Sequence, residues 1–173
     1  MYTTLNKIRT HAPCADGWKK LIKHLGKTEA DDEPLGIKTI LESNSLEDAI
    51  WCLRAVEGKD KEIRLFAVWC ARQVQHLIAD QRSRDTLDVA ERFANGLASE
   101  EELNDAASAA ARAAAWAAAG DAAYAARAAA YAAAGDAAYA AYAAAGDAAY
   151  AAWATRDAAK EAQSKKLIEI CED

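Results

Sequence analysis

Residues 133–154 read AAGDAAYAAYA followed by AAGDAAYAAWA, which are two copies of one 11-residue unit. A related stretch, GDAAYAARAAAY, occupies residues 120–131 and places its Gly-Asp pair 15 residues before the next one. Alanine has the highest helix propensity of all residues, so the alanine tract at 105–159 is predicted to be helical. Because 11 and 15 residues are both close to whole numbers of helical turns, each copy should keep the same facing along a helix.

Aromatic residues recur through the tract at intervals of 8, 7, 8, 3, 8 and 3 residues. At the angular pitch of an 11-residue repeat, these intervals place the rings in one sector of a helix, which predicts a single aromatic stripe. The rings could supply the packing volume that alanine lacks, or they could form a recognition surface, since tyrosine and tryptophan are enriched at binding hot spots. The candidate interaction residues are Trp116, Tyr124, Tyr131, Tyr139, Tyr142, Tyr150 and Trp153.

The glycines of the tract bear on its continuity. Gly120, Gly135 and Gly146 each precede an aspartate, and a Gly-Asp pair can end one helix and cap the next. The helices between such breaks would be short, and the constant facing of the repeat copies would then be a coincidence. We therefore expect a long helix that is kinked and folded back as a hairpin at Gly120 or Gly135.

Before residue 105 the composition is that of an ordinary globular protein with clear helix signals. The strongest amphipathic pattern runs from Lys61 to Ile78 and is predicted to lie at the centre of the core. Ser45-Leu-Glu-Asp48 and Ser99-Glu-Glu-Glu102 resemble capping boxes that start further helices. No run of alternating β-branched residues occurs. We predict an all-α fold with a globular helical head at 1–104 and an alanine-rich helical arm at 105–173.

Charge and composition exclude several functional classes. The chain carries 21 Lys/Arg and 27 Asp/Glu, a net charge of −6, which argues against a DNA-binding protein because such proteins need a basic face. The longest uncharged stretch of the tract, residues 137–146, is about half the length needed to span a bilayer, so we expect no membrane segment. The four cysteines form no CxxC pair and are expected to be free thiols, which fits a cytoplasmic protein.

Candidate chemistry in the sequence is sparse. His11, Cys14 and His24 could form part of a zinc site, but no second close pair of ligands accompanies them. We therefore predict no enzyme activity, no cofactor and no bound metal. Two basic clusters could contact phosphates or an acidic partner, although a solvated surface is the simpler explanation of both. The first comprises Lys19, Lys20, Lys23 and Lys27, and the second comprises Arg82 and Arg84 beside Asp85.

Two stretches of the chain resemble a known family. Residues 13–55, PCADGWKKLIKHLGKTEADDEPLGIKTILESNSLEDAIWCLRA, are similar to the alanine-rich helical immunity proteins of phages and bacteria. Residues 61–106, KEIRLFAVWCARQVQHLIADQRSRDTLDVAERFANGLASEEELNDA, resemble a module that precedes alanine tracts in bacterial proteins. The resemblance implies a small protein that neutralises an effector by binding it and, in a phage, one that acts against host defence.

These observations lead to one expected function and two alternatives. We expect a non-catalytic inhibitor of the immunity or counter-defence type that occludes a protein effector. The first alternative is an anti-defence protein that sequesters a nucleotide-type immune signal, with Trp18, Trp51 or Trp69 stacking on the base. The second is a structural protein whose arm drives self-assembly, and a homo-oligomer is expected in any case.

Overall fold

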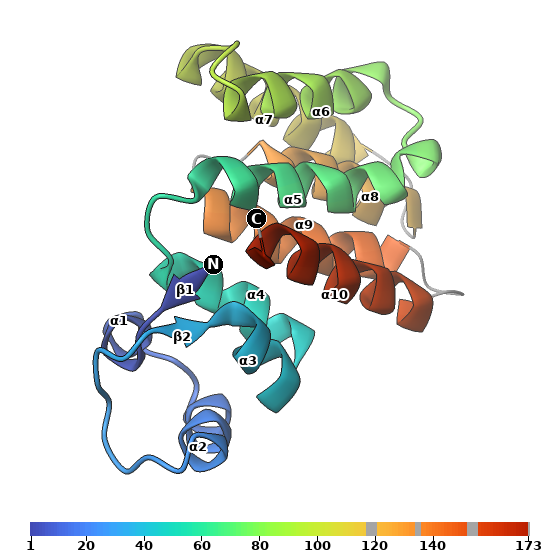
Figure 1. The fold of residues 1–173 in the computed structure, drawn as a ribbon. Helices are drawn as coiled ribbons and strands as arrows, with labels where there is room; N and C mark the ends of the chain where they lie inside the picture. Colours follow the sequence, from blue (N-terminus) through green and yellow to red (C-terminus); the bar gives the residue numbers. More distant parts are fainter. Residues whose placement is uncertain (117–120, 134–135, 152–155, 173) are drawn as a thin grey trace.

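A computed structural model describes residues 1–116, 121–133, 136–151 and 156–172 of the chain (Figure 1). The described residues are mostly helical, which confirms the all-α prediction, and β1 and β2 pair as a two-residue antiparallel ladder. The elements in chain order are β1 (Tyr2–Thr3), α1 (Leu5–Thr10), α2 (Ala15–His24), β2 (Leu35–Gly36), α3 (Ile37–Ser43), α4 (Leu46–Cys52), η1 (Leu53–Ala55), α5 (Asp60–Gln73), η2 (Gln75–Leu77), α6 (Gln81–Ala94), α7 (Glu100–Trp116), α8 (Asp121–Ala132), α9 (Ala137–Ala151) and α10 (Arg156–Glu172).

The predicted capping signals start helices α4 and α7. The Ser45 hydroxyl accepts a hydrogen bond from the backbone N–H of Asp48 at 3.1 Å. At the second site the bonds are reciprocal: the Ser99 hydroxyl accepts from the N–H of Glu102, and the Glu102 carboxylate accepts from the N–H of Ser99. These bonds satisfy backbone donors that the first turn of a helix leaves without partners, so both predicted starts are confirmed.

Helix α5 lies at the centre of the molecule, as its amphipathic pattern predicts. It packs against α6, α8 and α9, and Figure 1 shows α6 and α7 at one end of the molecule with α1 and α2 at the other. Phe66 and Cys70 on α5 are fully buried, and Ile63 is nearly so. The helix is shorter than predicted, because it ends at Gln73 and the chain continues as the short 3-10 helix η2.

The alanine tract folds back on itself, which confirms the predicted fold-back. The tract contributes to α7, α8, α9 and α10, and α8 packs along α9. Helix α8 begins at Asp121, and the Asp136 carboxylate caps α9 by accepting from the N–H of Tyr139. The third Gly-Asp pair lies inside α9, while Gly120 and Gly135 fall outside the described residues.

Folding back is favoured because it buries the alanine faces. Ala128 and Ala132 on α8, and Ala140 and Ala144 on α9, are fully buried, whereas a straight helix would leave such faces in water. These alanines belong to the same buried cluster as Phe66. The predicted boundary at 104/105 falls within α7.

The two ends of the chain lie close together (Figure 1). The N-terminal ammonium of Met1 donates to the backbone carbonyl of Cys171 near the end of α10. All four cysteines are free thiols, with Cys52 and Cys70 buried. Within the described ranges, no helix is both long and apolar enough to cross a bilayer.

Candidate functional site

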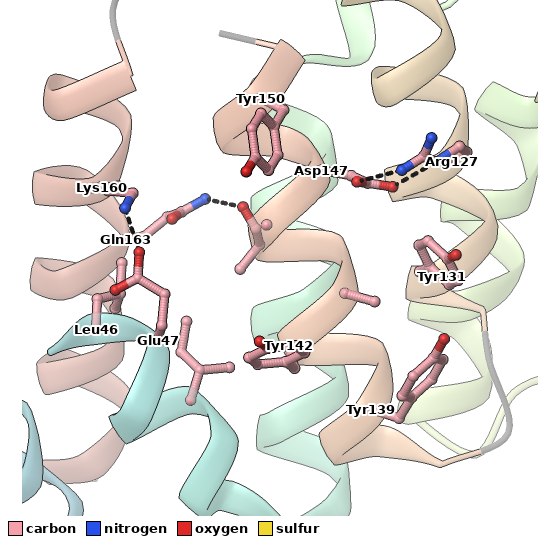
Figure 2. A pocket seen from close by; sticks show the side chains of 14 residues that line it. Leu46, Glu47, Arg127, Tyr131, Tyr139, Tyr142, Asp147, Tyr150, Lys160 and Gln163 are labelled. Atoms are coloured by element: carbon pink, nitrogen blue, oxygen red, sulfur yellow. Dashed lines mark hydrogen bonds and ion pairs between the residues drawn. The ribbon is translucent and has the colours of Figure 1, made fainter. Parts of the chain in front are cut away.

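Helices α4, α8, α9 and α10 enclose a cleft of about 360 Å³ that is lined by four tyrosines (Figure 2). We call it the tyrosine cleft. Its tyrosines are Tyr131, Tyr139, Tyr142 and Tyr150, all of which belong to the predicted set of interaction residues. The cleft therefore lies where the folded-back tract meets the helices of the N-terminal part.

The turn between α8 and α9 brings rings from the two helices together. Tyr131 near the end of α8 meets Tyr139 near the start of α9 edge to face, with centroids 5.7 Å apart. Farther from the turn, Tyr124 of α8 stacks on Tyr150 of α9 at 5.4 Å. Such pairs stabilise the α8–α9 hairpin beyond the area they bury, so the rings hold the walls of the cleft in place.

An ion pair forms one wall of the cleft. The Arg127 guanidinium donates from Nε and one terminal nitrogen to the two oxygens of Asp147, each at 3.0 Å. The guanidinium also lies over the ring of Tyr124, 4.8 Å from its centroid. Asp147 is only 7% exposed. Burial raises the pKa of this carboxyl above its usual range, although the hydrogen bonds from Arg127 act in the opposite direction.

Helix α10 supplies the polar groups of the opposite wall. Lys160 forms an ion pair with Glu47 of α4. Gln163 is 3% exposed, and its side-chain N–H donates to the backbone carbonyl of Ala145 at 3.0 Å (Figure 2). Its carbonyl oxygen accepts no hydrogen bond from the part of the chain that the structure describes. A ligand in the cleft could donate to that oxygen.

A second, smaller hollow of about 240 Å³ adjoins the tyrosine cleft. The two share Glu47 and Tyr142 in their linings. We call it the tryptophan hollow, because Trp18 of α2 and Trp51 of α4 form its aromatic walls. Asp48 also lines it.

Hydrogen bonds hold the polar floor of the tryptophan hollow. The Asn44 amide donates to the Asp48 carboxylate and to the backbone carbonyl of Gly17, each at 2.9 Å. These bonds tie α2 to the start of α4. The Arg54 guanidinium lies 4.2 Å from the centroid of the Trp51 ring, but Arg54 does not line the hollow.

The predicted aromatic residues divide into two groups. Tyr139, Tyr142 and Tyr150 are 48%, 42% and 41% exposed, so packing alone does not account for them. Tyr124 and Tyr131 are half-buried and pack against the core. Trp153 and the side chain of Trp116 lie outside the described residues.

The predicted lysine cluster lies on and just after α2 and does not line the cleft or the hollow. Lys27 forms ion pairs with Asp31 and Glu33, and the hydrogen bond that its ammonium donates to Asp31 is the main cause that raises the pKa of this lysine. Lys20 donates to the backbone carbonyl of Asn44 at 2.9 Å. Lys19 and Lys23 are exposed.

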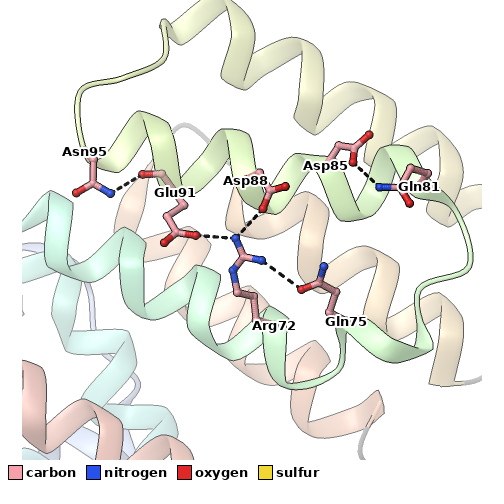
Figure 3. Close-up of polar contacts among 7 residues, drawn as sticks. All are labelled: Arg72, Gln75, Gln81, Asp85, Asp88, Glu91 and Asn95. Carbon is pink, nitrogen blue, oxygen red and sulfur yellow. Dashed lines mark hydrogen bonds and ion pairs between the residues drawn. The ribbon is translucent and has the colours of Figure 1, made fainter.

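In the second basic cluster, the side chains of Arg82, Arg84 and Asp85 all form local hydrogen bonds at the start of α6. Arg82 pairs with Asp80 at the start of α6, and Arg84 turns back to Gln81. Asp85 accepts from the Gln81 amide, as Figure 3 shows. The neighbouring polar cluster in that view centres on Arg72, which fastens α5 to α6 through Asp88 and Glu91.

Sequence reasoning singled out the tyrosines but missed the polar groups of the cleft. Arg127 and Asp147 are 20 residues apart, and Glu47 and Lys160 are 113 apart, so only the tertiary fold joins them. The signal available for this ion pair was that one repeat copy carries an arginine, Arg127, and a later copy carries an aspartate, Asp147. In the described ranges, which include His11 and His24, no three His, Cys, Asp or Glu side chains gather as metal ligands would.

Comparisons with protein-family models, with curated proteins and with solved structures gave no match to this chain.

Proposed function

We propose that this chain is a non-catalytic binding protein that sequesters a small organic molecule, and that the tyrosine cleft takes a planar ring of that molecule. The observation that carries the proposal is the convergence of four tyrosines and the buried Gln163 on one cleft. Three of the four rings are more than 40% exposed, which leaves part of each ring's surface accessible to a ligand. Exposed apolar side chains that gather on one surface, unlike those scattered singly, are typical of binding sites.

The composition of the cleft favours a flat, partly polar ligand. Tyrosine offers both an apolar face for stacking and a hydroxyl for hydrogen bonding. The carbonyl oxygen of Gln163, which accepts no hydrogen bond from the described residues, would accept one from a ring N–H. A volume of about 360 Å³ lies within the range of small-molecule sites.

The charges of the cleft decide which part of a nucleotide-type molecule it would hold. Arg127 and Lys160 are its cations, and each is already paired with a carboxylate. A phosphate would have to compete with Asp147 or Glu47 for them. The cleft therefore suits the base of a nucleotide-type signal, and the phosphates would extend towards solvent.

The family resemblance supports a neutralising role for such binding. The N-terminal stretches that resemble immunity proteins supply α2 and α4, which carry Trp18, Glu47 and Trp51 to the cleft and the hollow. We propose that the protein acts in the cytoplasm and, in a phage, against host defence, by holding the signal rather than converting it.

Ligand-induced thermal stabilisation tests this proposal. The full chain is melted with a panel of nucleosides, nucleotides and ring-free phosphates. A ligand present at about 100 times its Kd should stabilise the fold by about 2.7 kcal/mol, which corresponds to about 5–10 °C in Tm for a chain of this size. Stabilisation by ring-free phosphates alone, or by no member of the panel, would contradict a ring-binding cleft.

The Tyr142→Ala variant assigns the effect to the cleft. Because Tyr142 is 42% exposed, we expect its loss to change the free energy of unfolding by less than about 1 kcal/mol, while stabilisation by the ligand disappears. Tyr2→Ala is the matched control, since Tyr2 is 70% exposed on β1 and does not line the cleft. Equal ligand responses in the two variants would argue against binding at the cleft.

A second candidate function is occlusion of a protein effector, which the exposed rings of Tyr139, Tyr142 and Tyr150 favour. Aromatic residues of this kind are typical of protein–protein hot spots. Native mass spectrometry of the protein purified from its own host would distinguish the candidates. A co-purifying protein that Tyr142→Ala releases supports occlusion, a small bound mass supports sequestration, and a bare oligomer favours self-assembly.

A further inference from the structure

We propose that the tryptophan hollow binds an organic cation, such as a quaternary or primary ammonium group. Three aromatic side chains from three different helices line it: Trp18 of α2, Trp51 of α4 and Tyr142 of α9. The carboxylates of Glu47 and Asp48 line it as well. Aromatic faces attract cations through the ring quadrupole, and carboxylates add a full opposite charge. Apart from Glu47 and Tyr142 the hollow has its own lining, so this inference does not require a ring to bind in the tyrosine cleft.

The charge around the hollow supports this assignment. Glu47 pairs with Lys160 on the side of the tyrosine cleft. Asp48 instead accepts from the neutral amide of Asn44, and it forms no ion pair with a lysine or arginine of the described ranges. The charged side chains in the lining, Glu47 and Asp48, are both acidic, which disfavours binding of a phosphate and favours binding of a cation.

The nearest cations sit outside the hollow. Lys20 reaches the backbone carbonyl of Asn44, and Arg54 covers the Trp51 ring while its Nε donates to the Trp51 carbonyl. Neither side chain lines the hollow. Arg54 shows that the Trp51 ring already serves as a platform for one cation, and the hollow offers a second aromatic surface with acidic groups beside it.

The size of the hollow limits the ligand to a small head group. About 240 Å³ is less than most drug-sized ligands need. A trimethylammonium or guanidinium group would fit against Trp18 and Trp51 with its chain leaving past Tyr142. Because Tyr142 also lines the tyrosine cleft, a molecule with both a ring and an ammonium group could occupy both spaces.

Isothermal titration calorimetry of the full chain provides the test, with choline as the probe and 3,3-dimethylbutan-1-ol as its neutral isostere. The two have nearly the same shape and differ in charge. Both titrations are run at one ionic strength. We expect choline to bind at least about threefold more tightly than the alcohol, as a cation–aromatic contribution requires. Equal affinities, or no binding of choline at millimolar concentration, would overturn the proposal.

Two substitutions with matched controls locate the binding. Asp48→Asn keeps the shape of the side chain and removes its charge, so choline should bind several-fold more weakly while the alcohol is unaffected. Asp16→Asn makes the same charge change on the exposed side of α2 and should leave both probes unchanged. Trp18→Leu should weaken choline binding, whereas Trp69→Leu should not, because Trp69 stacks on Phe66 and does not line the hollow. Equal effects within either pair would place choline elsewhere.

A nucleoside panel separates this inference from the proposed function. Choline binding without ring binding leaves the hollow assigned and refutes the tyrosine cleft as the ring site. Ring binding without choline binding supports the tyrosine cleft as the ring site and refutes the hollow as a cation site.

Discussion

The two parts of the core are built from different side chains. In α3 and α5 the core includes large residues, such as Phe66, Ile37 and Ile40, each fully buried. Around α8 and α9 the fully buried residues are alanines, including Ala128 and Ala141. Large side chains fill the space between helices, whereas alanine lets helix backbones approach closely. The tract can therefore bury its faces without its aromatic rings, and the rings are left to line a cleft.

The largest expected effect comes from emptying the large-residue core. Phe66→Ala should lower the free energy of unfolding by about 3–5 kcal/mol, because the ring is fully buried at the centre of α5. Urea unfolding followed by circular dichroism measures the change. A cost below about 1 kcal/mol would mean that the site collapses around the cavity and that the contrast with the alanine core is smaller than the structure indicates.

Overfilling the alanine core is expected to have the next largest effect. Ala141→Leu should destabilise the fold by about 1–3 kcal/mol, since α9 packs against both α5 and α8 and Ala141 has no exposed surface. Ala158→Leu is the control, because Ala158 is exposed on α10. If the two variants have the same Tm, close approach of the helix backbones is not the reason why the tract contains alanine.

Gly146 offers a substitution in the alanine-rich part of the core that should stabilise the fold. It lies inside α9 on the cleft lining, and apart from its chain neighbours and the nearby backbone of α9 no atom of the described residues lies within 4 Å of the position that a Cβ would take. Alanine is favoured over glycine within a helix by about 0.5–1 kcal/mol, so Gly146→Ala should raise Tm while it narrows the cleft and weakens ring binding. Gly96→Ala is the contrasting variant and should destabilise, because its φ of 72° is strained for alanine.

The smallest effect on stability concerns the pH response of Asp147. Since burial raises its pKa above the ordinary 3.8, the folded state holds this proton to a higher pH than the unfolded state does. Stability from this group is therefore present at acid pH and is lost as the pH rises through the native pKa. Relative to Asp147→Asn, the unaltered chain should lose stability between acid and neutral pH.

Unfolding free energies across that range, with exposed Asp157→Asn as the charge control, measure the effect. A gain in stability relative to Asp147→Asn as the pH rises would show that the pairing with Arg127 outweighs burial.

The features that depend on residues close together in the chain were predicted correctly. The amphipathic pattern of α5 and the serine caps of α4 and α7 depend on neighbouring residues and were predicted correctly. The short elements α1, β1 and β2 were missed, since two to six residues carry too little periodicity. The breaks in the alanine tract were underestimated, because the gain from packing α8 on α9 is a tertiary effect that propensity does not contain.

The candidate site was predictable only in its aromatic half. The repeat intervals marked Tyr139, Tyr142 and Tyr150, which all line the cleft. Gln163 and Glu47 reach the same cleft from helices far away in the sequence, and no spacing rule connects them. The tyrosine cleft and the tryptophan hollow adjoin each other only because α9 packs next to α4. A single sequence does not reveal this contact.

The position of α5 has a consequence for how the chain is made. Helix α5 is covered by α8 and α9, which leave the ribosome some 60 to 80 residues later. Until then the face that carries Phe66 is open to solvent, and contacts across such separations close slowly. We expect nascent chains that end before residue 121 to be recognised by chaperones and proteases, and folding to complete only when the last third of the protein has been synthesised.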